Sequence, residues 1–141
     1  MYYIDTSIIV AYYCPEPLSE KVEDFITAHA RLAISNLTEL ELFSAISRKI
    51  CEGNMVRKHG SRVISKFIAH LDDLFYVRLP IESHHYTLAR DWIGQFSSPL
   101  RSLDAIHLAI ASSSGSTFIT ADEGLAKTAE MFSVDVSLIQ G

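Results

Sequence analysis

Short apolar runs alternate with longer amphipathic segments along the whole chain. Apolar runs bounded by polar residues predict strands at 2–4, 32–34, 75–79, 117–119 and 134–138. Segments with apolar residues three or four positions apart predict helices at 7–13, 18–30, 36–52, 56–71, 82–96, 101–113 and 123–131. Strands separated by helices predict a three-layer α/β/α fold, with a parallel sheet of four or five strands and helices on both faces.

The chain shows no internal repeat, low-complexity tract or Pro/Gly-rich linker, so we expect a single domain over 1–141. An apolar content of 48% and a charged content of 21% are typical of a soluble globular domain. Cys14 and Cys51 form no C-x-x-C pair, which fits reduced thiols rather than a metal site or a disulfide framework. No apolar run is long enough to cross a bilayer, and Asp5 stands where a signal peptide carries Lys or Arg, so we expect a cytoplasmic protein with no membrane segment.

The charge of the chain is unevenly distributed. The net charge is -5, which argues against a protein that holds nucleic acid by bulk electrostatics. The stretch 48–66 nevertheless contains six Lys or Arg residues and a single acid, Glu52. Two interpretations stay open: a basic strip beside an acidic site, or a solvated helix face.

One predicted helix is apolar nearly all round. Seven of the nine residues from Leu103 to Ala111 are apolar, around Asp104 and His107, and such a helix is expected to be buried. His107 is then either a hydrogen-bonded core histidine or a partner of Asp104 one turn away. The neighbouring pair His84 and His85 points in two directions on a helix, which we interpret as surface.

Four acids follow or open predicted elements where parallel strands end. Asp5 follows the first strand directly, Asp122 comes shortly after the fourth strand, Asp104 opens the apolar helix, and Glu41 lies early in the helix after the second strand. Ligands of open parallel sheets bind at the carboxyl ends of the strands. Taken singly, each acid has another explanation: Asp5 and Asp122 as helix caps, Asp104 as a first-turn acid, Glu41 as a surface residue.

Together the acids predict a metal site. Two carboxylates about 4 Å apart repel by about 4 kcal/mol at an effective dielectric near 20, so a cluster needs a raised pKa or a bound cation. A set of Asp and Glu without Cys or His at ligand spacing suits Mg²⁺ or Mn²⁺ rather than zinc.

Four segments carry these acids in order: Y-I-D-T-S, I-S-N-L-T-E-L-E-L, L-R-S-L-D-A-I-H-L-A-I-A and F-I-T-A-D-E-G-L-A-K-T-A. They resemble the acidic motifs of the PIN-domain nucleases, and most of all those of the small VapC-type toxins of toxin-antitoxin pairs. The resemblance implies catalytic, metal-binding roles for Asp5, Glu41, Asp104 and Asp122. It also implies support from the hydroxyls of Thr6 and Thr120.

Two glutamates compete for the second motif. Glu39 and Glu41 lie two positions apart on a helix and therefore face about 200° from each other, so only one can face the site. Helical periodicity does not choose between them, because both flank the apolar positions Leu37, Leu40 and Phe43. The spacing of the family motif after Ser35 favours Glu41.

The acids and the resemblance together favour a metal-dependent ribonuclease that hydrolyses RNA phosphodiester bonds. Whether it uses one ion or two stays open. The resemblance further implies a homodimer and a cognate antitoxin whose C-terminal segment covers the acidic groove. One alternative is a Mg-dependent phosphatase-like domain, which would want a second Asp where Ser7 stands. The other is a catalytically inactive PIN-fold binding module, which retention of all four acids argues against.

Overall fold

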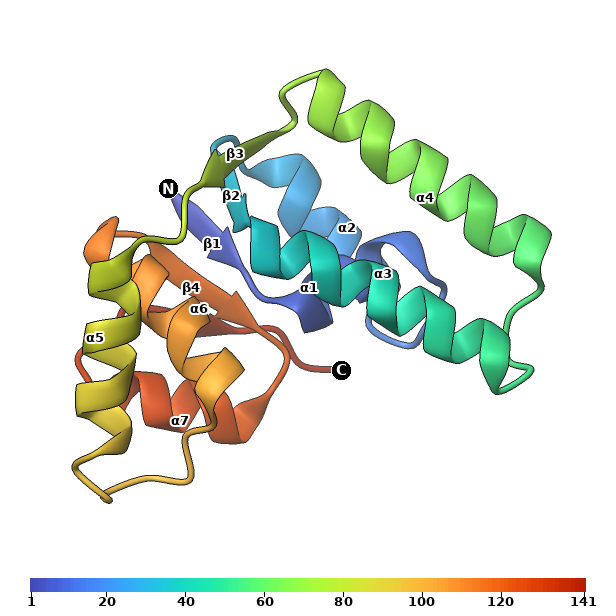
Figure 1. Cartoon of the computed structure of the whole chain (residues 1–141). Coiled ribbons are helices and arrows are strands. Elements are labelled where there is room, and N and C mark those ends of the chain that lie inside the picture. The colour runs from blue at the N-terminus through green and yellow to red at the C-terminus, as the bar shows by residue number, and fades with distance from the viewer.

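A five-stranded parallel sheet in the order β3-β2-β1-β4-β5 forms the centre of the computed structural model, which describes residues 1–141 (Figure 1). The strands are β1 Tyr2–Ile4, β2 Leu32–Ser35, β3 Tyr76–Leu79, β4 Thr117–Thr120 and β5 Val136–Leu138. The helices are α1 Thr6–Tyr13, α2 Ser19–Ala28, α3 Asn36–Cys51, α4 Arg57–Asp72, α5 Ser83–Ile93, α6 Ser102–Ser113 and α7 Glu123–Met131. The predicted α/β fold is confirmed.

Two hydrophobic cores lie on opposite faces of the sheet. Successive side chains of a strand point to opposite faces, so Ile4 and Ile119 pack with α1 to α4 whereas Tyr3 and Phe118 pack with α5 to α7. All seven residues from Ala105 to Ala111 are buried, as expected for the apolar helix α6. Each layer of helices therefore has its own core, and the sheet separates them.

Some element ends differ from the pattern-based prediction. The helix expected at 82–96 stops at Ile93, with Gly94 at its C-cap. Phe96 then takes a positive φ of 54° and is 90% exposed, because a tight turn follows the helix. The last strand begins at Val136 rather than 134, after a turn in which Ser133 has a φ of 58°.

The chain builds the sheet outward in two opposite directions from β1 and β4, which are neighbours near its middle. From β1 the chain continues to β2 on one side, and β4 pairs with β1 on the other, with Ile4 opposite Ile119. The backbone N–H of Asp5 donates to the carbonyl of Ile119 at 2.9 Å. The carboxyl ends of β1 and β4 therefore lie side by side, at the position where open α/β sheets bind ligands. None of the helices combines the length and apolar character needed to cross a bilayer.

Candidate functional site

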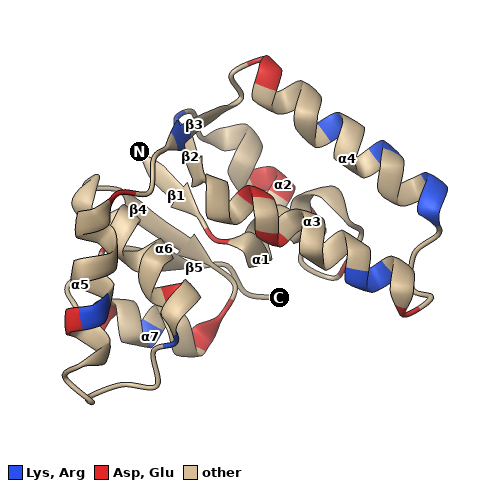
Figure 2. Ribbon diagram, viewed as in Figure 1, with Lys and Arg blue, Asp and Glu red and all other residues tan.

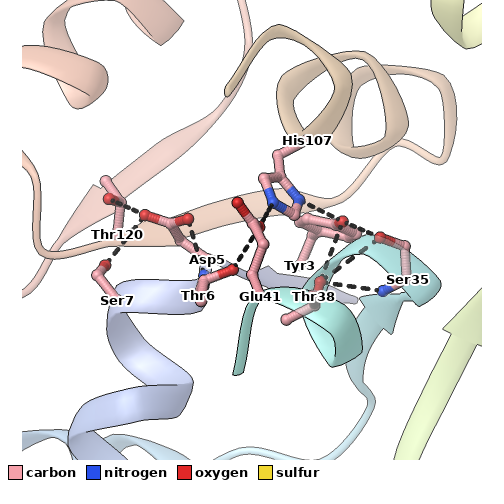
Figure 3. Close-up of polar contacts among 9 residues, drawn as sticks. All are labelled: Tyr3, Asp5, Thr6, Ser7, Ser35, Thr38, Glu41, His107 and Thr120. Atoms are coloured by element: carbon pink, nitrogen blue, oxygen red, sulfur yellow. Dashed lines mark hydrogen bonds and ion pairs between the residues drawn. The ribbon is translucent and has the colours of Figure 1, made fainter. Parts of the chain in front are cut away.

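Asp5 occupies the junction between β1 and α1. It caps the helix, with Oδ1 accepting from the backbone N–H of Thr6 at 2.8 Å. Oδ2 accepts from the hydroxyls of Ser7 at 3.0 Å and Thr120 at 2.8 Å (Figure 3). Asp5 as a residue is only 7% exposed, so these three donors replace the water that its carboxylate loses and fix its orientation.

Thr120 connects Asp5 to Asp122. Its hydroxyl donates to Asp5 and accepts from the backbone N–H of Asp122 at 3.0 Å. Asp122 caps α7, where its Oδ1 accepts from the N–H of Leu125 at 3.1 Å. Asp5 and Asp122 are thus helix caps and neighbours at the same time, so capping does not exclude a place in one cluster of acids.

Glu41 approaches from α3. Its Oε1 accepts from the hydroxyl of Thr6 at 2.7 Å and lies 2.5 Å from Nε2 of His107 (Figure 3). Burial opposes ionisation of Glu41, but the hydrogen bonds from His107 and from the Thr6 hydroxyl outweigh it and hold the pKa of Glu41 below its usual value. Thr6 bridges the two carboxylates, since its backbone N–H donates to Asp5 and its hydroxyl donates to Glu41.

Asp104 is the fourth carboxyl, in the first turn of α6. Burial raises its pKa, and the charges of Asp5, Asp122 and Glu41 raise it further, against an opposing effect of His107. The structure therefore brings all four predicted acids within electrostatic range of one another. They come from both layers, with Asp5 at the N-cap of α1 and Glu41 in α3 on one side, and Asp104 in α6 and Asp122 at the N-cap of α7 on the other.

A pocket of about 210 Å³ opens beside Asp104 and Asp122, with Arg101 and Thr128 also in its lining. No three His, Cys, Asp or Glu side chains lie close enough together to hold one metal ion directly. The carboxylate and hydroxyl oxygens still fit a hard cation, because Mg²⁺ keeps several waters and needs only one or two direct carboxylates. Burial is the main reason that the pKa of Asp104 is raised, and the charges of Asp5, Asp122 and Glu41 add a repulsion that a bound cation would relieve.

Glu39 points away from these acids. Both of its oxygens accept from the guanidinium of Arg78 on β3, at 3.0 and 2.8 Å. The structure therefore places Glu41, and not Glu39, beside Asp5 and His107.

Three further residues complete the polar network, and the sequence singled out only one of them. His107 is 1% exposed and hydrogen-bonded, so it is a core histidine and a neighbour of the acids at once. Ser7, which the sequence offered only as an argument against a phosphatase, donates to Asp5. Tyr3 was missed because an apolar strand gives no sign that a tyrosine hydroxyl reaches His107. The contact of Ser7 could have been predicted from the sequence, because its hydroxyl stands two positions after an Asp at the end of a strand.

The interpretation of His85 as a surface residue was wrong. His84 is exposed, but His85 is only 5% exposed, and its Nδ1 accepts from the backbone N–H of Glu82 at 2.9 Å. This contact satisfies a free N–H at the start of α5, which is why an imidazole is accommodated in the interior.

Comparison with known proteins identifies the family of this chain. The family model of the PIN domain matches residues 2–131. The chain belongs to the PIN domain family. Over 144 aligned residues it is 32% identical to Ribonuclease VapC35 of Mycobacterium tuberculosis, covering 96% of this chain and 95% of that protein.

Solved structures support the PIN fold at lower sequence identity. The crystal structure of VapC20 from Mycobacterium tuberculosis, a Sarcin-Ricin loop cleaving toxin, matches with a TM-score of 0.72 at 12% identity, over 90% of this chain and 94% of that one. A chain of VapBC2 from Rickettsia felis, solved with a DNA fragment from its promoter, matches with a TM-score of 0.71 at 14% identity, over 97% of both chains.

The charges of this PIN domain are separated in space. Lys and Arg residues lie along α4 and at the end of α3, whereas acidic residues mark the β1–α1 junction, the first half of α3 and the start of α7 (Figure 2). A groove of about 510 Å³ on α4 is lined by His59, Arg62 and Lys66, with Tyr13 of α1 on its wall. The basic stretch of the sequence thus forms a surface distinct from the acids.

Proposed function

We propose that this protein is a metal-dependent ribonuclease, the toxin component of a type II toxin-antitoxin pair, which hydrolyses RNA phosphodiester bonds. One observation carries the proposal: Asp5, Glu41, Asp104 and Asp122 converge at the carboxyl ends of β1 and β4, in a chain that is 32% identical to Ribonuclease VapC35. Since its proposed substrate is RNA, the proposal places the protein in the cytoplasm.

The four acids would hold Mg²⁺ or Mn²⁺, partly through water. The chemistry that such an ion supplies is activation of a water for in-line attack and screening of charge on the scissile phosphate. The chain's own residues contribute a site formed in advance. Thr6, Ser7 and Thr120 fix Asp5 before any ligand arrives, and Thr6 and His107 fix Glu41. Such preorganisation lowers the cost of reaching the reactive geometry.

The basic surface of α4 supports an RNA substrate despite the net charge of -5. Arg57, Lys58, Arg62 and Lys66 all belong to this helix, and two of them line its groove. Lys66 also lies over the ring of Tyr12, 5.9 Å from its centroid. We assign these cations to the phosphate backbone of RNA, which carries no base specificity.

Protein partners belong to the same proposal. An apolar groove of about 490 Å³ between α5 and α6 is lined by Tyr86, Ile93 and Leu103, and the first and last of these are 59% and 51% exposed. Exposed apolar patches of this kind mark protein interfaces. The proposal assigns such surfaces to a second copy of the chain and to a cognate antitoxin, whose C-terminal segment covers the acidic groove.

The test is RNA cleavage by the purified chain with Mg²⁺ or Mn²⁺. EDTA should abolish cleavage, and Asp5→Asn should lower the rate by orders of magnitude while the circular dichroism spectrum stays that of the wild type. Glu39→Gln is the matched control, because Glu39 is an acid of the same motif that pairs with Arg78 instead. Full activity of Asp5→Asn would overturn the proposal. Sequencing of RNA ends that accumulate on controlled expression would then identify the target.

A further inference from the structure

A buried chain of hydrogen bonds ends on the carboxylate of Glu41. The hydroxyl of Tyr3 lies 2.8 Å from Oγ of Ser35 and 2.7 Å from Nδ1 of His107 (Figure 3). The other ring nitrogen, Nε2, lies 2.5 Å from Oε1 of Glu41. Tyr3 and Ser35 are fully buried and His107 is 1% exposed, so water does not compete for these contacts.

The order of donors along this chain follows from the chemistry of its ends. An ionised carboxylate only accepts, so Nε2 of His107 carries the proton that bonds Glu41. In the neutral imidazole Nδ1 must then accept, and the proton comes from the hydroxyl of Tyr3. Burial raises the pKa of Tyr3 to about 12, against the opposing hydrogen bonds of Ser35 and Thr38, so this hydroxyl stays protonated. The hydroxyl of Ser35 in turn donates to Tyr3, and no buried side-chain polar atom lacks a partner.

We infer that His107, locked by Tyr3 in the tautomer protonated at Nε2, is a positioning residue that aims the carboxylate of Glu41 at the acidic site. The inference rests on the proposed function, because that function assigns metal binding to Glu41. Apart from His107, only the hydroxyl of Thr6 forms a hydrogen bond with Glu41. The side chain of Glu41 is 26% exposed. A glutamate has three rotatable side-chain bonds, so a single partner leaves it several orientations.

The placement of His107 links two carboxylates through one helix. His107 and Asp104 are three positions apart on α6 and therefore share a face. The helix thus presents one acid itself and orients a second acid that belongs to the opposite layer. A buried imidazole among apolar residues costs free energy unless both nitrogens are bonded, and here the bonds lead to Glu41.

Two substitutions of similar size separate positioning from packing. In His107→Gln the amide nitrogen lies near the place of Nε2 and can still donate to Glu41, whereas in His107→Asn it lies near Nδ1 and falls short. Partners that orient metal ligands typically contribute about 10- to 100-fold to metal affinity. We expect His107→Asn to raise the half-saturating Mn²⁺ concentration by that factor, and His107→Gln to raise it much less.

Titration calorimetry of the full chain with Mn²⁺ measures this concentration, and the melting temperature of each metal-free variant is recorded alongside. A histidine that only packs the core would lower the melting temperature in both variants and leave Mn²⁺ binding by the folded molecules unchanged. That result, or an equal reduction of Mn²⁺ affinity in the two variants, would overturn the inference.

The tautomer has its own test, which needs neither RNA nor metal. Long-range ¹H–¹⁵N spectra of the wild type should show His107 protonated at Nε2 and bare at Nδ1. Tyr3→Phe removes only the hydroxyl, since the ring keeps its stacking on Phe118, so it should lose this signature and weaken Mn²⁺ binding in the same direction as His107→Asn. A wild-type spectrum with Nδ1 protonated, or a Tyr3→Phe protein indistinguishable from wild type, refutes the lock. A wild type that binds Mn²⁺ but cleaves no RNA would count against the ribonuclease alone.

Discussion

In the metal-free protein the carboxylate of Asp104 is repelled by the neighbouring acids, so removing the charge of Asp104 should stabilise the metal-free protein. Asp104→Asn keeps the size of the side chain and deletes the charge that Asp5, Asp122 and Glu41 oppose. Two carboxylates about 4 Å apart repel by about 4 kcal/mol at an effective dielectric near 20, and the repulsion falls in proportion as their separation grows. Asp104 is only half buried, so solvent screens part of the repulsion, and we expect a net gain of about 1 kcal/mol in the free energy of unfolding. For a chain of this length that is a rise of about 3 to 5 °C in melting temperature.

Calorimetric melting of metal-free and metal-loaded samples tests this expectation. Mg²⁺ or Mn²⁺ at a hundredfold excess over its dissociation constant should stabilise the wild type by about 2.7 kcal/mol, and Asp104→Asn much less. Asp24→Asn on α2 is the matched control, because Asp24 is an exposed acid on a helix that supplies none of the four carboxylates. It should alter neither the metal-free melting temperature nor the response to metal.

The dependence on pH has a definite sign. Because the pKa of Asp104 is raised in the folded state, its charge destabilises the fold at pH 7, and that stability is recovered as pH falls through the raised pKa toward the ordinary value of 3.8. Glu41 acts in the opposite sense: its pKa is lowered, so its contribution is present above 4.5 and disappears as pH falls further. The stability difference between wild type and Asp104→Asn isolates the first effect and should shrink as pH falls from 7 to about 4. A difference that is absent at pH 7, together with indifference to metal, would refute the account of the cluster.

The remaining predictions concern the two glutamates and the basic surface. Glu41→Gln should lower the rate of RNA cleavage by orders of magnitude, as Asp5→Asn does, whereas Glu39→Gln should be nearly silent; single-turnover assays on both variants would expose the reverse result, in which the wrong glutamate was assigned. Replacing Arg62 and Lys66 by Ala should weaken RNA binding and flatten its dependence on salt, by about one unit of log–log slope for each phosphate that the variant no longer neutralises. An unchanged slope would mean that this face of α4 is only solvated.

The sequence predicted the elements, and the positions of two acids at strand ends, because both depend on local patterns. Strands and helices follow from spacing, and Asp5 and Asp122 stand at strand ends, where a parallel sheet gathers ligands. The sequence did not decide between capping and clustering for Asp5, because the same residue types do both. The decisive hydrogen bond, from Thr120, comes from 115 positions away.

The errors and omissions also have a common physical source in tertiary structure. Nothing in the periodicity of α3 separated Glu39 from Glu41, and the distinction depends on Arg78 in a strand 39 positions further on. His85 looked exposed because adjacent histidines on a helix cannot both face the interior. Only the position of the α5 N-terminus, which sets His85 against the N–H of Glu82, shows which of the two is buried.

The distribution of the four acids along the chain has a consequence for synthesis. Asp5 is translated before the other three acids, whereas Asp122 follows the fourth of five strands and belongs to the layer of α6 and α7. A nascent or truncated chain that lacks β4 and α7 holds at most three of the carboxylates, and it also lacks the Thr120 hydroxyl that orients the first. The fold therefore delays assembly of the complete acidic cluster until β4 and the start of α7 have been made.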